Sequence, residues 1–406
     1  KKLGKEEDYK YYIKRAQNYK NLLNLQTGFM RPRKNGNWIS PFDPREVNNN
    51  FTEANSWQYS FYMPQDVFGY TEIIGGRKNL ESKLDDLFTE NSQTTGRDQS
   101  DITGLIGQYA HGNEPSHHIA YLYNFTGAAH KTQAMVHRIM NEMYSDTPDG
   151  LEGNEDCGQM SAWYVLSALG FYPVTPGTTD FIIGTPLFPS ATIFLENGKL
   201  FTINAKKEKN KNFYIQSAYL NNAAHNKSYL SYFDIAKGGQ LNFNMTNKPS
   251  DFGKTGMPVT AIRDNLIVLN PVIDGGPISF RGTKKIFIYS NQPDVTLYYT
   301  TDGSRPSTKK KKVTGDFYVD SSVTIKAIAI HKNGDKSFVT TARYTKMPHN
   351  LTIKLNTPYE QQYDGNGENG LIDNIRGEVD WRKGNWQGYQ KTDLDAVIDL
   401  QEVKQV

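Results

Sequence analysis

Residues 159–170, QMSAWYVLSALG, and the change of pattern after them decide the fold. This stretch is apolar over about three helical turns and ends at Gly170. It therefore predicts a buried helix that stops at a left-handed glycine. From about Asp180 apolar and polar residues alternate instead, which is typical of strands. We expect the chain to change from helices to sheet near residue 178.

The part before this point has the spacing of amphipathic helices. Apolar side chains or rings recur every three or four positions in three stretches, residues 8–19, 77–88 and 130–144. Long loops with Gly and Pro, residues 31–50 and 91–101, separate these stretches. We therefore expect a helical bundle or toroid whose loops carry function.

The part after this point predicts a small sheet. Asn197-Gly198, within residues 192–203, is the strongest short signal for a hairpin. Further strands are expected at residues 213–220 and 240–245. A linker that contains one strand is expected over residues 253–269.

The last third of the chain predicts all-β modules. Turns at Asp302-Gly303 and Asn333-Gly334 separate strand-like runs with the spacing of a seven-stranded sandwich. A final β-rich piece is expected to be incomplete. We thus expect multidomain α + β architecture in four parts, residues 1–178, 179–269, 270–346 and 347–406.

Composition excludes several classes of protein. In 406 residues, 46 Lys and Arg nearly balance 43 Asp and Glu, which argues against a nucleic-acid binder. The basic run at residues 309–312 is interpreted as a solvated loop. With 25 Tyr and 20 Phe the chain cannot be largely disordered. No apolar run approaches the ~18 residues that span a membrane, so no transmembrane segment is expected.

The ends of the chain and its cysteine add two expectations. The chain begins with Lys1, without an initiator Met or a signal-peptide pattern, so we expect it to be a piece of a longer protein. Cys157 is the single cysteine, which excludes an internal disulfide and a Cys-based metal centre. We expect it to be a small buried residue and not a nucleophile.

Three segments of the helical part carry dense polar residues at loop-to-helix junctions. They read FTEANSWQYS at residues 51–60, followed by Asp66, then YAHGNEPSHHI at residues 109–119 and DGLEGNEDCGQM at residues 149–160. Two separated carboxylates with an aromatic platform are what glycoside hydrolysis needs. Carboxylate and amide oxygens gathered together also suit Ca²⁺.

These candidates also have plain structural interpretations. Glu53 and Asp66 could be capping or surface groups, and Trp57 a core residue. Asp156 could be the N-cap of the helix that follows it. Zinc is disfavoured because the histidines of the second segment do not form the pair of a His-Glu-x-x-His helix.

Three long motifs resemble one known family. They are HGNEPSHH at residues 111–118, GNEDCGQMSAWY at residues 153–164 and ALGFYPV at residues 168–174. They closely resemble the catalytic domain of glycoside hydrolase family 92, bacterial Ca²⁺-dependent exo-acting α-mannosidases, from the start of the chain to about residue 249. The resemblance implies part of an (α/α)6 toroid with a small β-rich extension. An N-terminal β-sandwich and the first toroid helices are expected to lie outside this chain.

The resemblance implies hydrolysis with inversion by two carboxylates. Glu53 matches the general acid and Asp156 the general base. Asn154 stands where some relatives carry a second acidic residue that helps the base, and its amide departs from that pattern. The carboxyl groups of an inverting pair stand roughly 6.5–9.5 Å apart, with room for the attacking water.

The resemblance also implies a Ca²⁺ ion that binds O2 and O3 of an α-mannoside. The expected protein ligands are Asn113 and Glu114, with Gln58 as a further candidate. Expected partners or supports of the sugar are Trp57, Asp66, His111, His117 and His118. The implied substrates are mannose-containing glycans, and the implied location is the periplasm or cell surface of a bacterium.

The C-terminal part carries two further resemblances. YYTTDGSRP at residues 298–306 resembles the small domain that follows bacterial chitobiases and hexosaminidases. YDG at residues 363–365 and WRKGNWQGY at residues 381–389 resemble the opening half of a discoidin-type (F5/8 C) sandwich. Because neither module implies catalysis, an inactive mannoside-binding protein or adhesin stays open as the alternative, although Glu53 and Asp156 oppose it.

Overall fold

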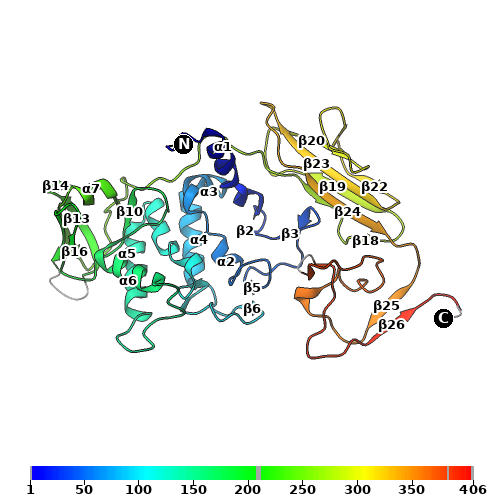
Figure 1. Ribbon diagram of the computed structural model, residues 1–406, viewed down its shortest axis with the longest axis horizontal. Coiled ribbons are helices and arrows are strands. Elements are labelled where there is room, and N and C mark those ends of the chain that lie inside the picture. Colours follow the sequence, from blue (N-terminus) through cyan, green and yellow to red (C-terminus); the bar gives the residue numbers. More distant parts are fainter. Residues whose placement is uncertain (1, 207–211, 382–383, 404–406) are drawn as a thin grey trace.

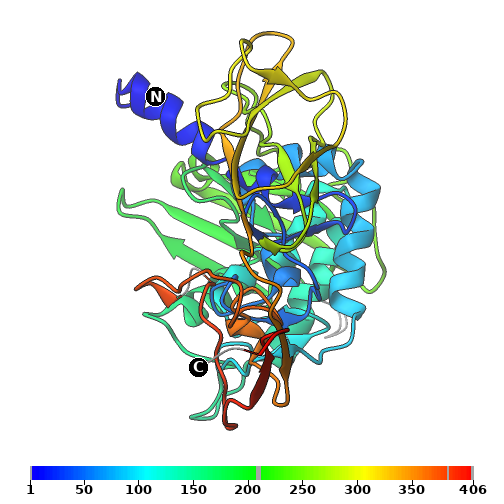
Figure 2. The same ribbon diagram turned by 90° about the vertical axis from the view of Figure 1, so that its right-hand side faces the viewer.

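The computed structural model describes residues 2–206, 212–381 and 384–403. Helices stand in the middle of Figure 1, with one β region on the left and two on the right. Figure 2 views the right-hand β regions from their own side. No helix of the described residues is long and apolar enough to cross a membrane.

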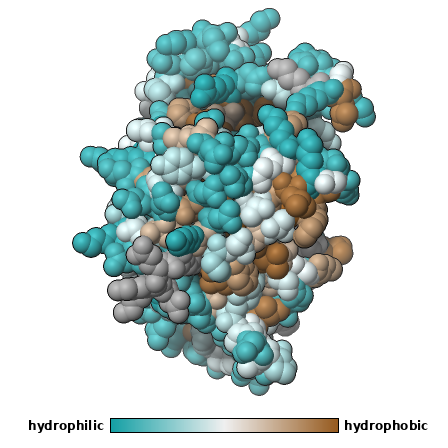
Figure 3. Space-filling model, turned by 90° about the vertical axis from the view of Figure 1, so that its left-hand side faces the viewer, coloured by the Kyte–Doolittle hydropathy of each residue, from teal (hydrophilic) through white to brown (hydrophobic). Residues whose placement is uncertain are grey.

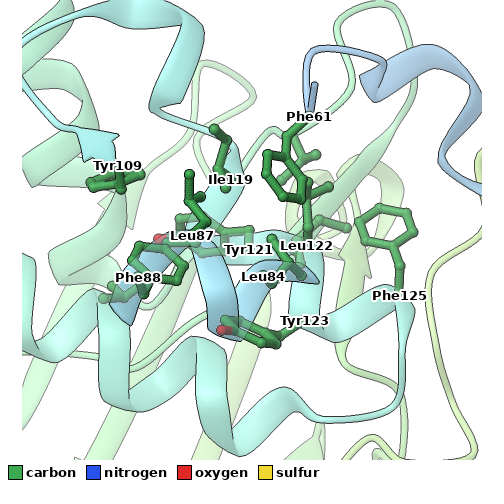
Figure 4. Close-up of a cluster of buried hydrophobic side chains, with 14 of the residues drawn as sticks. Phe61, Leu84, Leu87, Phe88, Tyr109, Ile119, Tyr121, Leu122, Tyr123 and Phe125 are labelled. Carbon is green, nitrogen blue, oxygen red and sulfur yellow. The ribbon is translucent and has the colours of Figure 1, made fainter. Parts of the chain in front are cut away.

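The helical part is built around one hydrophobic core. Its helices are α1 (Glu6–Arg15), α2 (Ser56–Tyr59), α3 (Val67–Ile73), α4 (Arg77–Thr89), α5 (Ala129–Glu142) and α6 (Gln159–Leu169). Helix α4 buries Leu80, Leu84, Leu87 and Phe88, one face at the predicted spacing (Figure 4). The predicted helices at residues 77–88, 130–144 and 159–170 are confirmed. That these helices belong to an (α/α)6 toroid stays a prediction.

Two details at the helix ends follow from local chemistry. Helix α6 ends where predicted, because Gly170 adopts a φ of 101° and its N–H bonds back to Ser167. Helix α1 buries none of its residues and stops earlier than the predicted stretch of residues 8–19. The chain then forms a 3₁₀ turn, η1 (Asn18–Asn21), after the fully buried Gln17.

The long loops contain short paired strands that the pattern did not predict. These are β1 (Leu23–Asn24), β2 (Phe29–Met30), β3 (Arg33–Lys34), β4 (Asn37–Trp38), β5 (Glu46–Val47), β6 (Thr95–Gly96), β7 (Leu105–Ile106) and β8 (Tyr109–Ala110). Further 3₁₀ turns are η2 (Pro64–Asp66), η3 (Glu114–Ser116) and η4 (Ile119–Phe125). Such two-residue ladders are too short for an alternating pattern to reveal them.

The region after α6 forms the predicted small sheet. Its strands are β9 (Phe171–Tyr172), β10 (Asp180–Ile183), β11 (Ser190–Phe194), β12 (Leu200–Lys206), β13 (Tyr214–Leu220), β14 (Ala223–Ala224), β15 (Tyr229–Ser231) and β16 (Gly239–Thr246), with helix α7 (Tyr232–Ala236). Strands β11 and β12 form the expected hairpin, and a five-stranded sheet has the order β11-β12-β16-β13-β14. This end of the molecule faces the viewer in Figure 3, where hydrophobic side chains lie among hydrophilic ones.

The strand predicted within residues 253–269 is wrong. That segment forms only an isolated bridge between Gly256 and Lys227. It runs instead along the helical part, where Thr260 O accepts a hydrogen bond from Phe68 N and Ile262 N donates to Asp66. The segment satisfies its backbone against other elements, so it needs no neighbouring strand.

The next module is a sandwich of two sheets with eight strands, one more than the predicted spacing. They are β17 (Val272–Asp274), β18 (Ser279–Phe280), β19 (Lys284–Tyr289), β20 (Val295–Thr300), β21 (Lys311–Lys312), β22 (Phe317–Val319), β23 (Val323–His331) and β24 (Thr340–Lys346). The sheet orders are β17-β19-β22 and β18-β24-β23-β20-β21. The last piece has η5 (Gln361–Tyr363) and one antiparallel pair, β25 (Thr352–Leu355) with β26 (Ala396–Asp399).

Candidate active site

Three carboxylates from the three polar segments lie together. Glu53 precedes α2, Glu114 opens η3, and Asp156 precedes α6. Burial raises the pKa of Glu114, and so do its hydrogen bond with Asp156 and the negative charges of Asp156 and Glu53. None of the ion pairs between described residues includes any of the three. The segments predicted from their polarity therefore converge in one acidic cluster.

Both carboxylates predicted to act on the substrate stand on unusual backbone. Glu53 has a φ of 52° and Asp156 a φ of 44°, in the left-handed region that non-glycine residues seldom adopt. The next residue, Cys157, has a φ of 57° and is exposed, so its predicted burial is wrong. Its place on a turn ahead of α6 leaves it outside the core. Backbone strain of this kind gathers at functional sites.

Asp156 is not the N-cap of α6, and that interpretation is wrong. The N-cap position belongs to Gly158, which supplies no side chain. Glu155 does the capping instead, since its carboxylate accepts from Ser161 N at 3.1 Å and from Ser161 Oγ at 3.0 Å. The Asp156 carboxylate is thereby left to face Glu114. The exposed Asn154 beside it donates from Nδ2 to Asp101 Oδ1 at 3.0 Å.

Asn113 ties two of the converging segments together. Its Nδ2 donates to the backbone oxygen of Glu53 at 2.8 Å, and its Oδ1 accepts from Glu114 N at 3.1 Å. The side chain thus fixes the Glu53 loop against η3. One amide positions both carboxylates.

Gln58 is committed to the start of helix α2. Its Oε1 accepts from Asn55 N at 2.8 Å as one half of a capping box, and its Nε2 donates to Gln108 O at 2.8 Å. Gln58 is only 1% exposed. Gln58 therefore fits a structural role better than the predicted role of metal ligand.

The remaining predicted ligands fit a hard cation in their chemistry. Glu114 offers carboxylate oxygens, and Asn113 Oδ1, which already accepts from Glu114 N, keeps a second lone pair for a cation. No Lys or Arg of the described residues pairs with the neighbouring carboxylates. Within the described ranges, no three His, Cys, Asp or Glu side chains are arranged as a metal site. Because Ca²⁺ takes six to eight oxygens, Glu114 and Asn113 alone would supply only part of its shell.

The histidines of the second segment lie buried beside the acidic cluster. Both ring nitrogens of His111 bond to phenols, Nδ1 to Tyr109 at 2.8 Å and Nε2 to Tyr144 at 2.7 Å. His117 bonds from Nε2 to His111 O at 2.9 Å and from Nδ1 to Gln159 Nε2 at 3.1 Å. Both rings thus have their polar atoms in use, so we assign them the supporting role rather than direct contact with a sugar.

Burial also keeps these histidines neutral. It lowers the pKa of His117 to about 4, and it lowers the pKa of His118 to about 4 as well. The His118 Nε2 bonds to the backbone oxygen of Phe61 at 2.8 Å. The pKa of His111 is held far below its ordinary value by burial and then by His117.

Trp57 and Asp66 lie inside the helical part. Trp57 is 6% exposed and meets Phe29 edge-on, with ring centroids 4.6 Å apart, as the core interpretation expects. Asp66 is fully buried and caps α3 by accepting from Gly69 N at 3.2 Å, so the capping interpretation is confirmed. It also bonds to the hydroxyl of Tyr19 at 2.8 Å and pairs with Lys20 at 3.1 Å. We assign both residues a supporting role.

Sequence reasoning missed the residues that hold this layer. Tyr109, Tyr144 and Gln159 bond to the histidines, and Asp101 bonds to Asn154. Tyr109 and Gln159 lie within the polar segments, and that position could have indicated their role. Tyr144 lies outside them and carries no such signal, whereas Asp101 ends the loop of residues 91–101, which is expected to carry function.

Comparison with known proteins identifies the helical part. Residues 1–247, more than half of the chain, match the Glycosyl hydrolase family 92 catalytic domain. The chain belongs to this family. Residues 274–341 match the Chitobiase/beta-hexosaminidase C-terminal domain. These matches agree with two of the three predicted resemblances, while the discoidin-type resemblance stays a prediction.

Solved structures of family 92 proteins are similar to the chain. One is the family GH92 alpha-mannosidase BT3965 from Bacteroides thetaiotaomicron, with 41% identity, a TM-score of 0.59, and coverage of 64% of this chain and 34% of that one. Another is the family GH92 inverting mannosidase BT2199 from the same organism, with 35% identity, a TM-score of 0.57, and coverage of 64% and 37%.

One further relative is similar in sequence, and all matches cover only part of the relative's length. An uncharacterized secreted glycosidase of Arthroderma benhamiae is 27% identical over 280 residues, which cover 62% of this chain and 34% of that protein. The chain thus spans about a third of the length of the relatives it matches. The activities of these relatives belong to proteins about three times as long as the matched region of this family 92 chain.

Proposed function

We propose that the protein to which this chain belongs is an exo-acting α-mannosidase that hydrolyses with inversion and uses Ca²⁺. One observation carries the proposal, the convergence of Glu53, Glu114 and Asp156 from three distant segments without a basic partner among the described residues. Membership of family 92 supports it. Relatives described as mannosidases support it as well, and the structure of one of them contains mannoimidazole.

In this proposal Glu53 and Asp156 divide the chemistry. Glu53 donates a proton to the leaving glycosidic oxygen, and Asp156 takes a proton from the water that attacks the anomeric carbon from the opposite face. The exposure of both side chains suits contact with a substrate. The amide of Asn154 orients the water beside the base.

The proposed metal role rests on oxygen donors. Glu114 and Asn113 would hold Ca²⁺, which when bound supplies Lewis-acid attraction for two hydroxyls of the mannoside. Glu114 otherwise stands in repulsion with Asp156 and Glu53, which is the condition that a cation relieves. Gln58 has no part in this proposal, because its amide is committed to the cap of α2.

The test uses the full-length enzyme with two substrates, α-linked mannobiose and an activated aryl α-mannoside. Glu53→Gln should abolish hydrolysis of mannobiose, a loss of about 10²–10⁴-fold, and spare much of the aryl mannoside, whose leaving group needs no proton. Glu152→Gln, an exposed carboxylate of the third polar segment, is the matched control. Equal loss on both substrates would contradict the role of Glu53.

A chelator tests the metal role separately. EDTA should remove the activity and added Ca²⁺ should restore it, because the proposed ion binds both the protein and the sugar. Activity that EDTA leaves intact would overturn this part. Affinity for mannosides without any released mannose would instead favour the sugar-binding alternative.

The proposed location is outside the cytoplasm, in the periplasm or at the surface of a bacterial cell. The description of a relative as secreted supports it. Mannose-containing glycans of other cells would be the substrates there.

A further inference from the structure

The hairpin of β3 and β4 connects the helical part with both C-terminal modules. Its residues Arg33 and Trp38 pair, as do Lys34 and Asn37, around a turn of Asn35 and Gly36. These turn residues have φ values of 50° and 79°, which an Asn-Gly turn accepts readily. In Figure 1 the hairpin lies between the two right-hand β regions.

The tip of the hairpin bonds to the sandwich module at Arg343, in the stretch of β24 that β18 does not pair with. Asn35 Nδ2 donates to Arg343 O at 2.8 Å, and Arg343 N donates to Asn35 Oδ1 at 2.7 Å. The amide thus imitates a neighbouring strand. Gly36 O accepts from Ile273 N at 3.1 Å, and Asn37 Nδ2 donates to Asp274 Oδ1 at 2.7 Å.

Packing at the tip leaves no spare room. A Cβ on Gly36 would lie 3.1 Å from Thr340 Cγ2 and 3.3 Å from Thr341 O. Arg33 adds a hydrogen bond at 2.8 Å to Pro271 O. The last piece of the chain is attached as well, because Lys34 Nζ pairs with Asp364 at 3.1 Å.

The chain before the hairpin holds helix α2. In strand β2, Met30 N donates to Ser60 Oγ at 2.9 Å and Met30 O accepts from Ser56 Oγ at 2.6 Å. Both serines are fully buried. Glu53 lies three residues before the first residue of α2, so the position of this helix bears on the position of the proposed acid.

The chain after the hairpin bonds to the N-terminal end of the same helix. Trp57 N donates to Pro44 O at 3.3 Å, and Asn55 Nδ2 donates to Arg45 O at 3.4 Å. The stretches of chain on both sides of the hairpin are therefore bonded to α2. A displacement of the hairpin is transmitted from two sides.

We propose that residues 33–38 are a positioning element, through which the sandwich module holds the Glu53 loop in the arrangement that proton donation requires. The inference rests on the proposed function for its catalytic readout. Asn35 and Gly36 are positioning residues and do not touch the reacting atoms. The module is thus part of the hydrolytic assembly and more than an appended sugar binder.

The experiment compares matched glycine substitutions in the full-length enzyme. Gly36→Ala forces a Cβ into the packed contact, whereas Gly334→Ala makes the same change in Asn333-Gly334, an Asn-Gly turn of the sandwich module. Gly334 has a φ of 93°, and a Cβ there would meet no described atom within 4 Å. Asn35→Ala, which removes two hydrogen bonds without adding bulk, is the second test variant.

Positioning predicts a dependence on the leaving group. Gly36→Ala and Asn35→Ala should lower kcat on mannobiose roughly tenfold with KM nearly unchanged, because a small displacement of a catalytic group is costly. Activity on the activated aryl mannoside should stay near that of Gly334→Ala. Equal losses on both substrates, or wild-type kcat in both variants, would overturn the inference.

Hydrogen exchange separates this inference from the proposed function. Amides of residues 53–60 should exchange faster in Gly36→Ala than in Gly334→Ala, whether or not the enzyme releases mannose. Unchanged exchange there would overturn the inference alone. A wild-type enzyme without mannosidase activity would overturn the proposed function and leave the exchange result standing.

Discussion

The acidic cluster and the buried histidine layer lie side by side and treat their polar atoms in opposite ways. Glu53 and Asp156 are exposed, and no ion pair of the described residues includes them. His111 and His117 are buried, with both ring nitrogens of each bonded to the protein. Polar groups that the protein saturates form a scaffold, and those it leaves unsatisfied are available to a ligand.

The largest expected effect is the loss of activity in Asp156→Asn. Since the amide cannot take a proton from water, kcat of the full-length enzyme should fall about 10²–10⁴-fold. Stability should hardly change, because the side chain is exposed and caps no helix. Steady-state kinetics and urea unfolding measure the two quantities. If Asp156→Asn proved unstable yet active, Asp156 would have a structural role like that of the buried histidines and no catalytic one.

Next in size is the expected loss of stability in Asp66→Asn. The buried carboxylate pairs with Lys20, caps α3 and accepts from Ile262 N at 2.9 Å. Losing the charge beside Lys20 should cost roughly 3 kcal/mol of unfolding free energy. Asp264→Asn, at an exposed carboxylate bonded by Tyr9, should stay within about 0.5 kcal/mol. Equal effects in urea unfolding would show that burial of Asp66 does not decide its role.

The smallest expected effect near neutral pH is a pH dependence carried by His118, which grows as the pH falls. Its pKa is lowered from 6.5 to about 4 by burial, so between these values the unfolded chain binds the proton and the folded one does not. Stability should therefore fall as pH drops from 6.5 towards 4. His118→Asn should flatten this slope in urea unfolding followed across the window. An unchanged slope would assign the acid sensitivity to other groups, such as His117.

The predictable parts of the fold have local causes. The face of α4, the stop at Gly170 and the hairpin around Asn197-Gly198 all follow from spacing and turn chemistry within a few residues. Asn35-Gly36 carries the same turn signal. Its flanking residues show no alternation of apolar side chains, so residues 31–50 have the pattern of a loop.

One error has a distant cause, and two arise from backbone and side-chain contacts within the third polar segment and the start of α6. The segment of residues 253–269 needs no strand because the helical part satisfies its backbone, and Asp156 is released from capping because Glu155 reaches Ser161. Cys157 is exposed because the turn that presents Asp156 carries it outward. The spacing of apolar and polar residues along the chain reveals none of these three outcomes.

The sequence by itself determined the helices α4, α5 and α6, the hairpin of β11 and β12 and the three polar motifs, because periodicity, turn residues and motif spacing are local properties of the chain. Only the tertiary structure decided which polar side chains remain free. Asp66 finds a partner in Ile262 and Asn113 finds one in Glu53, while Glu114 meets Asp156. Contacts between such distant positions depend on how the elements pack, and they separate the proposed catalytic carboxylates from those that hold the fold.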